Sequence, residues 1–119
     1  MADSASLQPR SLGKIAVPTP GTPVRVTSDT SIRAHRIRFA VVLGETGRVF
    51  LGVAGMNKAT GAGVVKEFWP TGAGGGVADE LVLESAAGEL RPSDYYLDAN
   101  TAGEGLIVAY WTWVPSYAS

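Results

Sequence analysis

The sequence predicts an all-β protein: an antiparallel, jelly-roll-like β-sandwich of seven or eight short strands with an extended N-terminal arm. Fifteen glycines and seven prolines divide the 119 residues into short pieces. Within these pieces the apolar residues alternate or form brief β-branched runs, instead of recurring every three or four positions as they do in an amphipathic helix. Short strands at near-regular spacing are typical of a sandwich or a jelly roll.

The N-terminal segment differs from the rest of the chain. Residues 1–11 are polar and aperiodic, which predicts a flexible or extended arm before a single β-sandwich domain over residues 12–119. Strands are expected at residues 14–17 and 23–27, with a Pro- and Gly-containing turn between them.

Residues 32–43 form the clearest predicted strand. One face is expected to carry His35, Ile37, Phe39, Val41 and Leu43. Arg36 and Arg38 point to the other face. Residues 44–47 contain two glycines and predict a hairpin turn that returns the chain as a partner strand over residues 48–53.

The last strand, residues 105–114, is the most hydrophobic piece of the chain. Further strands are expected at residues 64–69, 80–84 and 95–97, with a glycine-rich adaptable loop at 72–76 and a hairpin turn at 100–103. On the last strand, one face takes Leu106, Val108 and Tyr110, and the other takes Ile107, Ala109, Trp111 and Trp113. A strand that is apolar on both faces needs cover on both. Another subunit could supply the second cover, and so could the chain's own loops or its N-terminal arm.

Composition excludes several functions. Ten Lys and Arg against eleven Asp and Glu give a net charge of −1, so there is no basic excess to hold a polyphosphate; nucleic acid is disfavoured as the main partner, although a local patch could exist. Cysteine is absent, which removes thiol catalysis and cysteine-ligated zinc. No apolar run is long enough to span a membrane, and the first residues lack the pattern of a secretion signal, so we expect folding in a cytoplasm.

Catalytic and metal-binding patterns are also missing. His35 is the only histidine, and no Gly-x-Ser-x-Gly motif accompanies it. Glycoside hydrolysis needs two carboxylates across a cleft. Two pairs of acids lie four residues apart, Glu80 with Glu84 and Asp94 with Asp98, but neither is followed by a sequence pattern typical of a cleft. Residues 98–104 partly resemble a calcium loop but carry Ala102 at its fifth position. We therefore expect no enzyme activity, no cofactor and no metal.

Arginines and aromatic residues remain as candidates for binding. Half of the ten positive charges fall within residues 25–48, and they suggest a patch for an acidic protein partner, formed by Arg25, Arg36, Arg38 and Arg48 with Arg33 beside them. A solvated strand face with glutamates opposite is the alternative interpretation. Trp111 and Trp113 share a face with Ile107, and this set is the candidate oligomer interface. Exposed Tyr95, Tyr96 and tryptophan rings could instead form a platform for sugars.

Several short stretches together resemble small structural proteins of tailed bacteriophages, in which β-sandwich modules decorate or cement the head or form fibres and spikes. The resemblance spans residues 21–111 and is carried by the stretches 21–26, 37–40, 45–52, 94–99 and 105–111. It includes the Thr22-Pro23-Val24 opening and the Tyr96-Leu97-Asp98-Ala99 segment before the last strand. The glycine-rich 72–76 loop departs from the pattern.

This resemblance implies a non-enzymatic virion protein, assembled in the host cytoplasm. It would act as a capsid decoration or cement protein that forms a homo-oligomer, with a trimer favoured, and binds the major capsid protein or another virion protein. The N-terminal arm would reach across a neighbouring subunit. A carbohydrate-binding β-sandwich module is the alternative function.

Overall fold

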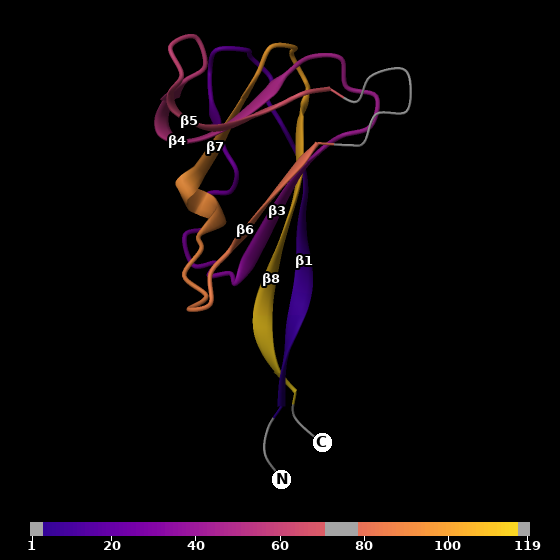
Figure 1. The fold of residues 1–119 in the computed structure, drawn as a ribbon, viewed down its shortest axis with the longest axis vertical. Helices are drawn as coiled ribbons and strands as arrows, with labels where there is room; N and C mark the ends of the chain where they lie inside the picture. The colour runs from indigo at the N-terminus through magenta and orange to yellow at the C-terminus, as the bar shows by residue number, and fades with distance from the viewer. Residues whose placement is uncertain (1–3, 71–78, 117–119) are drawn as a thin grey trace.

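The protein is a sandwich of two four-stranded antiparallel sheets, as predicted. The computed structural model describes residues 4–70 and 79–116, and its strands and sheets are seen in Figure 1. We call the first sheet sheet I; in spatial order it contains β1 (Ser4–Ala16), β8 (Gly105–Ser116), β3 (Arg36–Val41) and β6 (Glu80–Glu84). Sheet II contains β2 (Val24–Arg25), β7 (Tyr95–Ala99), β4 (Val49–Asn57) and β5 (Ala62–Phe68). A short 3₁₀ helix, η1 (Pro92–Asp94), leads into β7.

One hydrophobic core fills the space between the sheets. Sheet I contributes side chains that are fully buried, including Ile37, Phe39, Leu106 and Val108. Sheet II contributes Val49, Leu51, Phe68, Leu97 and Ala99 to the same cluster. Burial of a large apolar side chain stabilises a fold by about 1.5–3 kcal/mol, so this cluster is the main source of stability. The inward positions predicted for Ile37, Phe39 and Val41, and for Leu106 and Val108, are therefore confirmed. His35, predicted on the same face, is instead half-buried against Trp113 and is not part of the core cluster.

Two turns predicted as hairpins are crossovers between the sheets. Residues 44–47 connect β3 of sheet I to β4 of sheet II, and residues 100–104 connect β7 of sheet II to β8 of sheet I. β4 pairs with β5 and β7, not with β3. Leu43 is 87% exposed, because β3 ends at Val41 and the chain has left the sheet. Alternation reports which face of a strand is buried but not which strand is its neighbour.

The N-terminal segment is a strand of sheet I. β1 pairs with β8 along its whole length, with one register shift between Ser11 and Gly13. Residues 4–11 are thus extended, but they are not an arm separate from the sheet, and the expected boundary at residue 12 is wrong. An edge strand of this kind needs only its backbone to pair, so a polar sequence without periodicity can form it.

Two glutamates lock the crossovers to each other. Glu104 accepts hydrogen bonds from the backbone N–H groups of Thr46 (2.9 Å) and Gly47 (2.7 Å). In return, Glu45 accepts one from the N–H of Gly105, at 2.7 Å. Each carboxylate therefore satisfies backbone donors of the other crossover, and the two chain crossings are held at the same end of the sandwich.

Different surroundings give these two carboxyl groups opposite pKa shifts. Glu45 is only 6% exposed. This burial raises its pKa, against the smaller opposing effects of the Gly105 N–H and the Lys14 ammonium. Desolvation would also raise the pKa of Glu104. The hydrogen bonds from Thr46 and Gly47 outweigh it, so the pKa of Glu104 is lowered.

We expect Gly105→Ala to destabilise the protein. A Cβ atom on Gly105 would overlap the backbone carbonyl oxygen of Ile15, so β1 would have to move away from β8. Overpacking of this kind costs about 1–3 kcal/mol of unfolding free energy, measurable by urea denaturation. Ala102→Ser, on the exposed part of the same crossover, is the control and should change the unfolding free energy by less than about 0.5 kcal/mol. Equal stability of the two variants would contradict the close approach.

Replacing each glutamate of the crossovers by glutamine should produce opposite pH trends in melting temperature. A raised folded-state pKa means that protonated Glu45 favours folding, and that this contribution is lost as the pH rises through the folded pKa. Glu45→Gln should therefore gain stability relative to the wild type from pH 4 to pH 8. The lowered pKa of Glu104 stabilises the fold above the unfolded pKa, and this contribution is lost as the pH falls through the folded pKa, so Glu104→Gln should lose stability relative to the wild type as the pH rises from acid to the ordinary carboxyl value of 4.5. Parallel trends in the two variants would contradict the assignment.

Candidate functional site

The candidate site is the outer face of sheet I, opposite the core. The registers of β8 with β3, and of β3 with β6, place outward side chains of the three strands in rows across the sheet. Outward residues of this face are Ile107, Ala109 and Trp111 of β8, Arg36, Arg38 and Ala40 of β3, and Glu80, Val82 and Glu84 of β6. Trp113 lies two residues further along β8, where this strand pairs with β1 alone, and the two-residue period puts it on the same side as Trp111. The candidate interface residues Ile107, Trp111 and Trp113 are thus on one face, as the alternation predicted.

Apolar side chains on this face are open in the part of the chain that the structure describes. Trp113 is 49% exposed, Ile107 40% and Val82 39%. Trp111 is half-buried, with the guanidinium carbon of Arg36 5.5 Å from its ring centre. β1 does not cover the face, because it extends the sheet sideways. Val82 was not among the predicted site residues, because alternation does not reveal that β6 lies beside β3.

Charges on the outer face of sheet I are paired within the chain. Arg38 donates to Glu80 at 2.6 Å, and Arg36 lies 3.3 Å from Glu84. All four side chains are partly exposed, so each pair contributes little stability and mainly cancels charge. The face therefore carries both signs of charge in near balance.

The four arginines predicted as one patch lie in three places. Arg36 and Arg38 are on the outer face of sheet I, whereas Arg25 is on β2 of sheet II. Arg48 precedes β4, where its guanidinium stacks 3.7 Å from the centre of the Trp69 ring and pairs with Glu67 at 2.5 Å. Proximity in sequence misled the prediction, because the crossovers send consecutive strands to different sheets.

β1 and β8 continue beyond the sandwich as a two-stranded ribbon. β3 pairs with β8 only as far as Trp111, while five further β1–β8 pairs run from Gln8–Thr112 to Ser4–Ser116. Figure 1 shows this ribbon leaving the sandwich towards both termini, and the molecule measures 54 × 34 × 21 Å. Two strands alone are at best marginally stable in water, so the ribbon gains from a partner. Pro9 and the register shift after Ser11 interrupt the free edge of β1, which favours contact through a face over addition of a strand.

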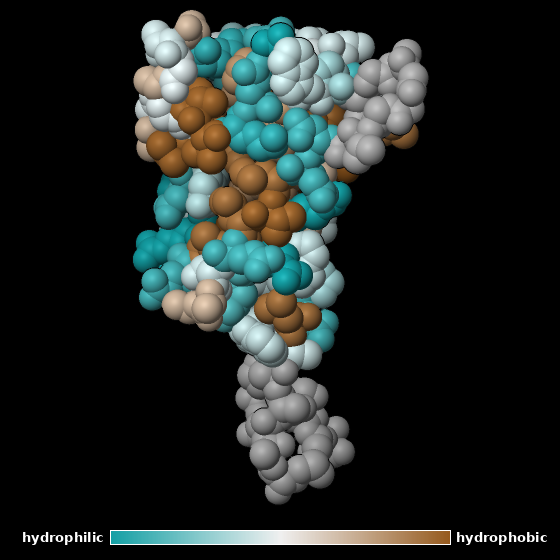
Figure 2. Space-filling view, viewed as in Figure 1, coloured by the Kyte–Doolittle hydropathy of each residue, from teal (hydrophilic) through white to brown (hydrophobic). Residues whose placement is uncertain are grey.

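Figure 2 shows the distribution of hydropathy on the side of the molecule seen in Figure 1. Hydrophobic residues gather in the middle of the sandwich, with hydrophilic residues around them.

His35 is placed for packing. Its ring meets that of Trp113 edge to face, with centres 5.8 Å apart, and lies against Gly88, where a Cβ atom would overlap the ring. The buried Nδ1 atom has no hydrogen-bond partner in the part of the chain that is described. Among the described residues, no carboxylate is hydrogen-bonded to this imidazole.

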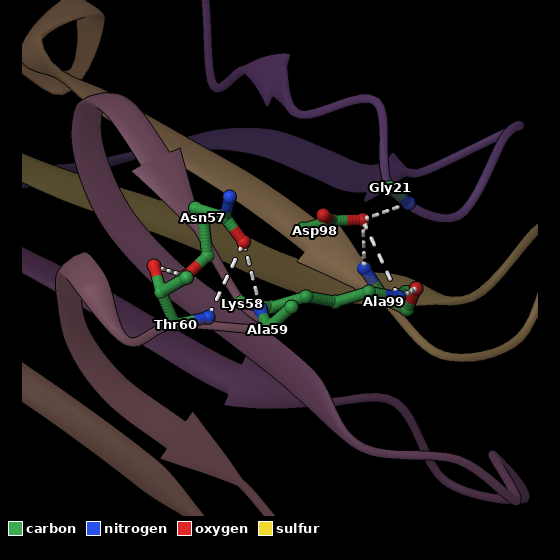
Figure 3. A network of polar contacts seen from close by, with 7 residues as sticks. All are labelled: Gly21, Asn57, Lys58, Ala59, Thr60, Asp98 and Ala99. Carbon is green, nitrogen blue, oxygen red and sulfur yellow. Dashed lines mark hydrogen bonds and ion pairs between the residues drawn. The ribbon is translucent and has the colours of Figure 1, made fainter.

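Acidic residues of the partial calcium loop serve separate structural roles. Asp98 is 1% exposed and accepts hydrogen bonds from the backbone N–H groups of Gly21 (2.9 Å) and Ala99 (2.8 Å), as Figure 3 shows. The ammonium of Lys58 lies 4.0 Å from Asp98 and donates to the carbonyl of Ala99. Glu104 points instead to the other crossover. Among residues 4–70 and 79–116, no group of three or more His, Asp or Glu side chains is arranged to hold a metal ion.

The aromatic residues proposed as a sugar platform are dispersed. Tyr95 packs against Phe39, with ring centres 5.7 Å apart, and its burial raises the pKa of its hydroxyl. Tyr96 lies on the outer side of sheet II beside Arg25. Trp69, at 55% exposure, follows β5. The glycine-rich loop predicted at 72–76 lies outside the described residues.

Comparison of the chain with protein-family models, with curated proteins and with solved structures finds no match. Within the described residues, no helix is both long and apolar enough to cross a membrane.

Fluorescence quenching can check the shielding of Trp111. In a variant that keeps Trp111 as its only tryptophan, removal of the Arg36 side chain by Arg36→Ala should increase quenching by acrylamide, because the guanidinium covers the ring. Arg38→Ala in the same background is the matched control and should leave quenching unchanged. An equal response to both substitutions would show that Arg36 does not cover Trp111.

Proposed function

We propose that this protein is a non-enzymatic structural protein of a tailed-bacteriophage virion. It acts as a capsid decoration or cement protein, which forms a homo-oligomer and binds the head shell. Its own subunits meet through the outer face of sheet I. The observation that carries the proposal is the partly exposed apolar side chains of β8 and β6 on that face, Trp113, Ile107 and Val82.

A second copy of the chain is the occupant that the charges of this face favour. Arg36 and Arg38 are balanced by Glu84 and Glu80. A face with near-zero charge does not repel its own copy, and it offers no strong field for an acidic or basic partner. Arginine, tryptophan and apolar side chains together resemble the core of an oligomer interface.

The ribbon gives each subunit a means of reaching its neighbour. The sequence resemblance implies a free N-terminal arm that reaches across a neighbouring subunit. In this proposal the paired residues of β1 and β8 beyond Trp111 make that contact instead. β8 runs from the sandwich into the ribbon and carries the exposed Ile107 in the first and the exposed Trp113 in the second. A trimer on a local symmetry axis of the shell would bury these two side chains three times.

The order of strands supports the same function by analogy. We interpret β1-β8-β3-β6 facing β2-β7-β4-β5 as the path of a jelly roll, in which all connections except β4–β5 cross between the sheets. Viral capsid domains use this fold, and lectins use it too. The fold alone assigns no function, so the proposal depends on the exposed face.

Light scattering at several concentrations tests the self-association. The wild type should have about three times the chain mass of 12.4 kDa, and Trp113→Ser should shift the mass towards that of the single chain, because it removes the most exposed apolar side chain of the face. Trp69→Ser removes a tryptophan of similar exposure elsewhere and is the matched control.

A wild-type protein that stays monomeric at all concentrations, or a Trp113→Ser variant that keeps the wild-type mass, would overturn the interface. Immunogold labelling of the phage particles that carry this gene, with an antibody against the protein, tests whether the protein lies on the head. Labelled heads support the proposal, and unlabelled particles contradict it.

A further inference from the structure

A separate hollow lies on the side of sheet II, away from the outer face of sheet I. It forms where β2, the start of β7 and the middle of β4 meet η1, and it has a volume of about 350 Å³. Its walls are Arg25, Val53, Ala54, Ser93, Asp94 and Tyr96. None of these residues belongs to the surface proposed for assembly.

Arg25 is held in place by one hydrogen bond, and its terminal N–H groups have no carboxylate partner among the described residues. Its Nε–H donates to the backbone carbonyl of Ser93 at 2.6 Å, and Ser93 is 1% exposed, so the anchor is rigid. Among the described residues no carboxylate lies within ion-pair distance of Arg25. The fork geometry of a guanidinium then leaves its terminal N–H groups to donate to a ligand.

Asp94 and Tyr96 complement this arginine. Asp94 is exposed and supplies carboxylate oxygens, which accept hydrogen bonds. Tyr96 pairs with Arg25 across β2 and β7, so both side chains point to the same side of the sheet, with the guanidinium carbon 6.0 Å from the ring centre. Val53, at 41% exposure, and Ala54 add apolar wall.

From these groups we infer that the hollow binds a neutral sugar ring. A hydroxyl group both donates and accepts hydrogen bonds, so neighbouring hydroxyls of a sugar can satisfy a donor-only Arg25 and the carboxylate oxygens of Asp94 together. The C–H face of the ring is apolar and fits against Val53 and Ala54, beside the Tyr96 ring over which Arg25 lies. The volume lies at the lower end of the range for ligand pockets, about 300–1,000 Å³, and matches one ring better than an extended oligosaccharide.

A simple carboxylate fits less well than a sugar. Arg25 alone would attract an anion, but Asp94 lines the same hollow and would repel it. The inference does not depend on the proposed virion role. Because the two surfaces belong to opposite sheets, a subunit assembled through sheet I keeps this hollow free.

Titration with sugars, followed by NMR of the ¹⁵N-labelled full chain, tests the site. Glucose, galactose, mannose and N-acetylglucosamine are the probes at millimolar concentration, with sodium acetate as the anionic probe. At least one sugar should shift the amide signals of residues 93–97 and 53–54 in a saturable manner. Asp94→Asn should weaken that binding about tenfold, since it removes a charged acceptor.

Glu89→Gln, at another exposed acid, is the matched control and should leave the affinity unchanged. Arg25→Lys keeps the positive charge but removes the planar pair of guanidinium N–H donors, so it should also weaken sugar binding. Saturable shifts with acetate and none with the sugars would make the hollow an anion site and overturn the inference. No shifts with any probe, or equal affinity of Asp94→Asn and the wild type, would overturn it too. Light scattering on the same samples reports assembly separately.

Discussion

Burial of the inner face of β8 is the constraint on which the rest of the structure depends. Leu106 and Val108 are fully buried in the core shared by the two sheets, and the β8 backbone is paired on both sides, with β1 and β3. A strand has a two-residue period, so these inward residues force Ile107, Trp111 and Trp113 outward. The hydrophobic character of the exposed face is thus a direct consequence of where β8 lies in the fold.

The crossover after β3 and the crossover before β8 are held together by hydrogen bonds from backbone N–H groups to carboxylates. Glu45 and Glu104 each accept hydrogen bonds from the other crossover, and Gly105 lets β1 approach where β8 begins. Buried or half-buried carboxylates are costly unless they are hydrogen-bonded, so this arrangement works only when both crossovers are in place. It links the positions of two connections that are about sixty residues apart in the chain.

The two sheets present different chemistry to the outside. Sheet I shows apolar side chains with internally paired charges, which suits extensive contact with a like surface. Sheet II shows a hollow lined by both Arg25 and Asp94, which suits a small polar ligand. A subunit built this way could use one side for assembly and the other for recognition, and the core between them keeps the two sides apart.

The sequence by itself determined the fold class, the strand at residues 80–84 and the inward and outward residues of β3 and β8, because alternation is a local consequence of strand geometry. It also placed Ile107, Trp111 and Trp113 on one face. Only the tertiary structure decided that residues 44–47 and 100–104 cross between sheets, that residues 4–11 pair with β8, and that Arg25 and Arg48 lie apart from Arg36 and Arg38. The choice of neighbouring strands depends on backbone hydrogen bonds and packing between residues distant in sequence, and a local pattern of apolar and polar residues carries no record of these partners.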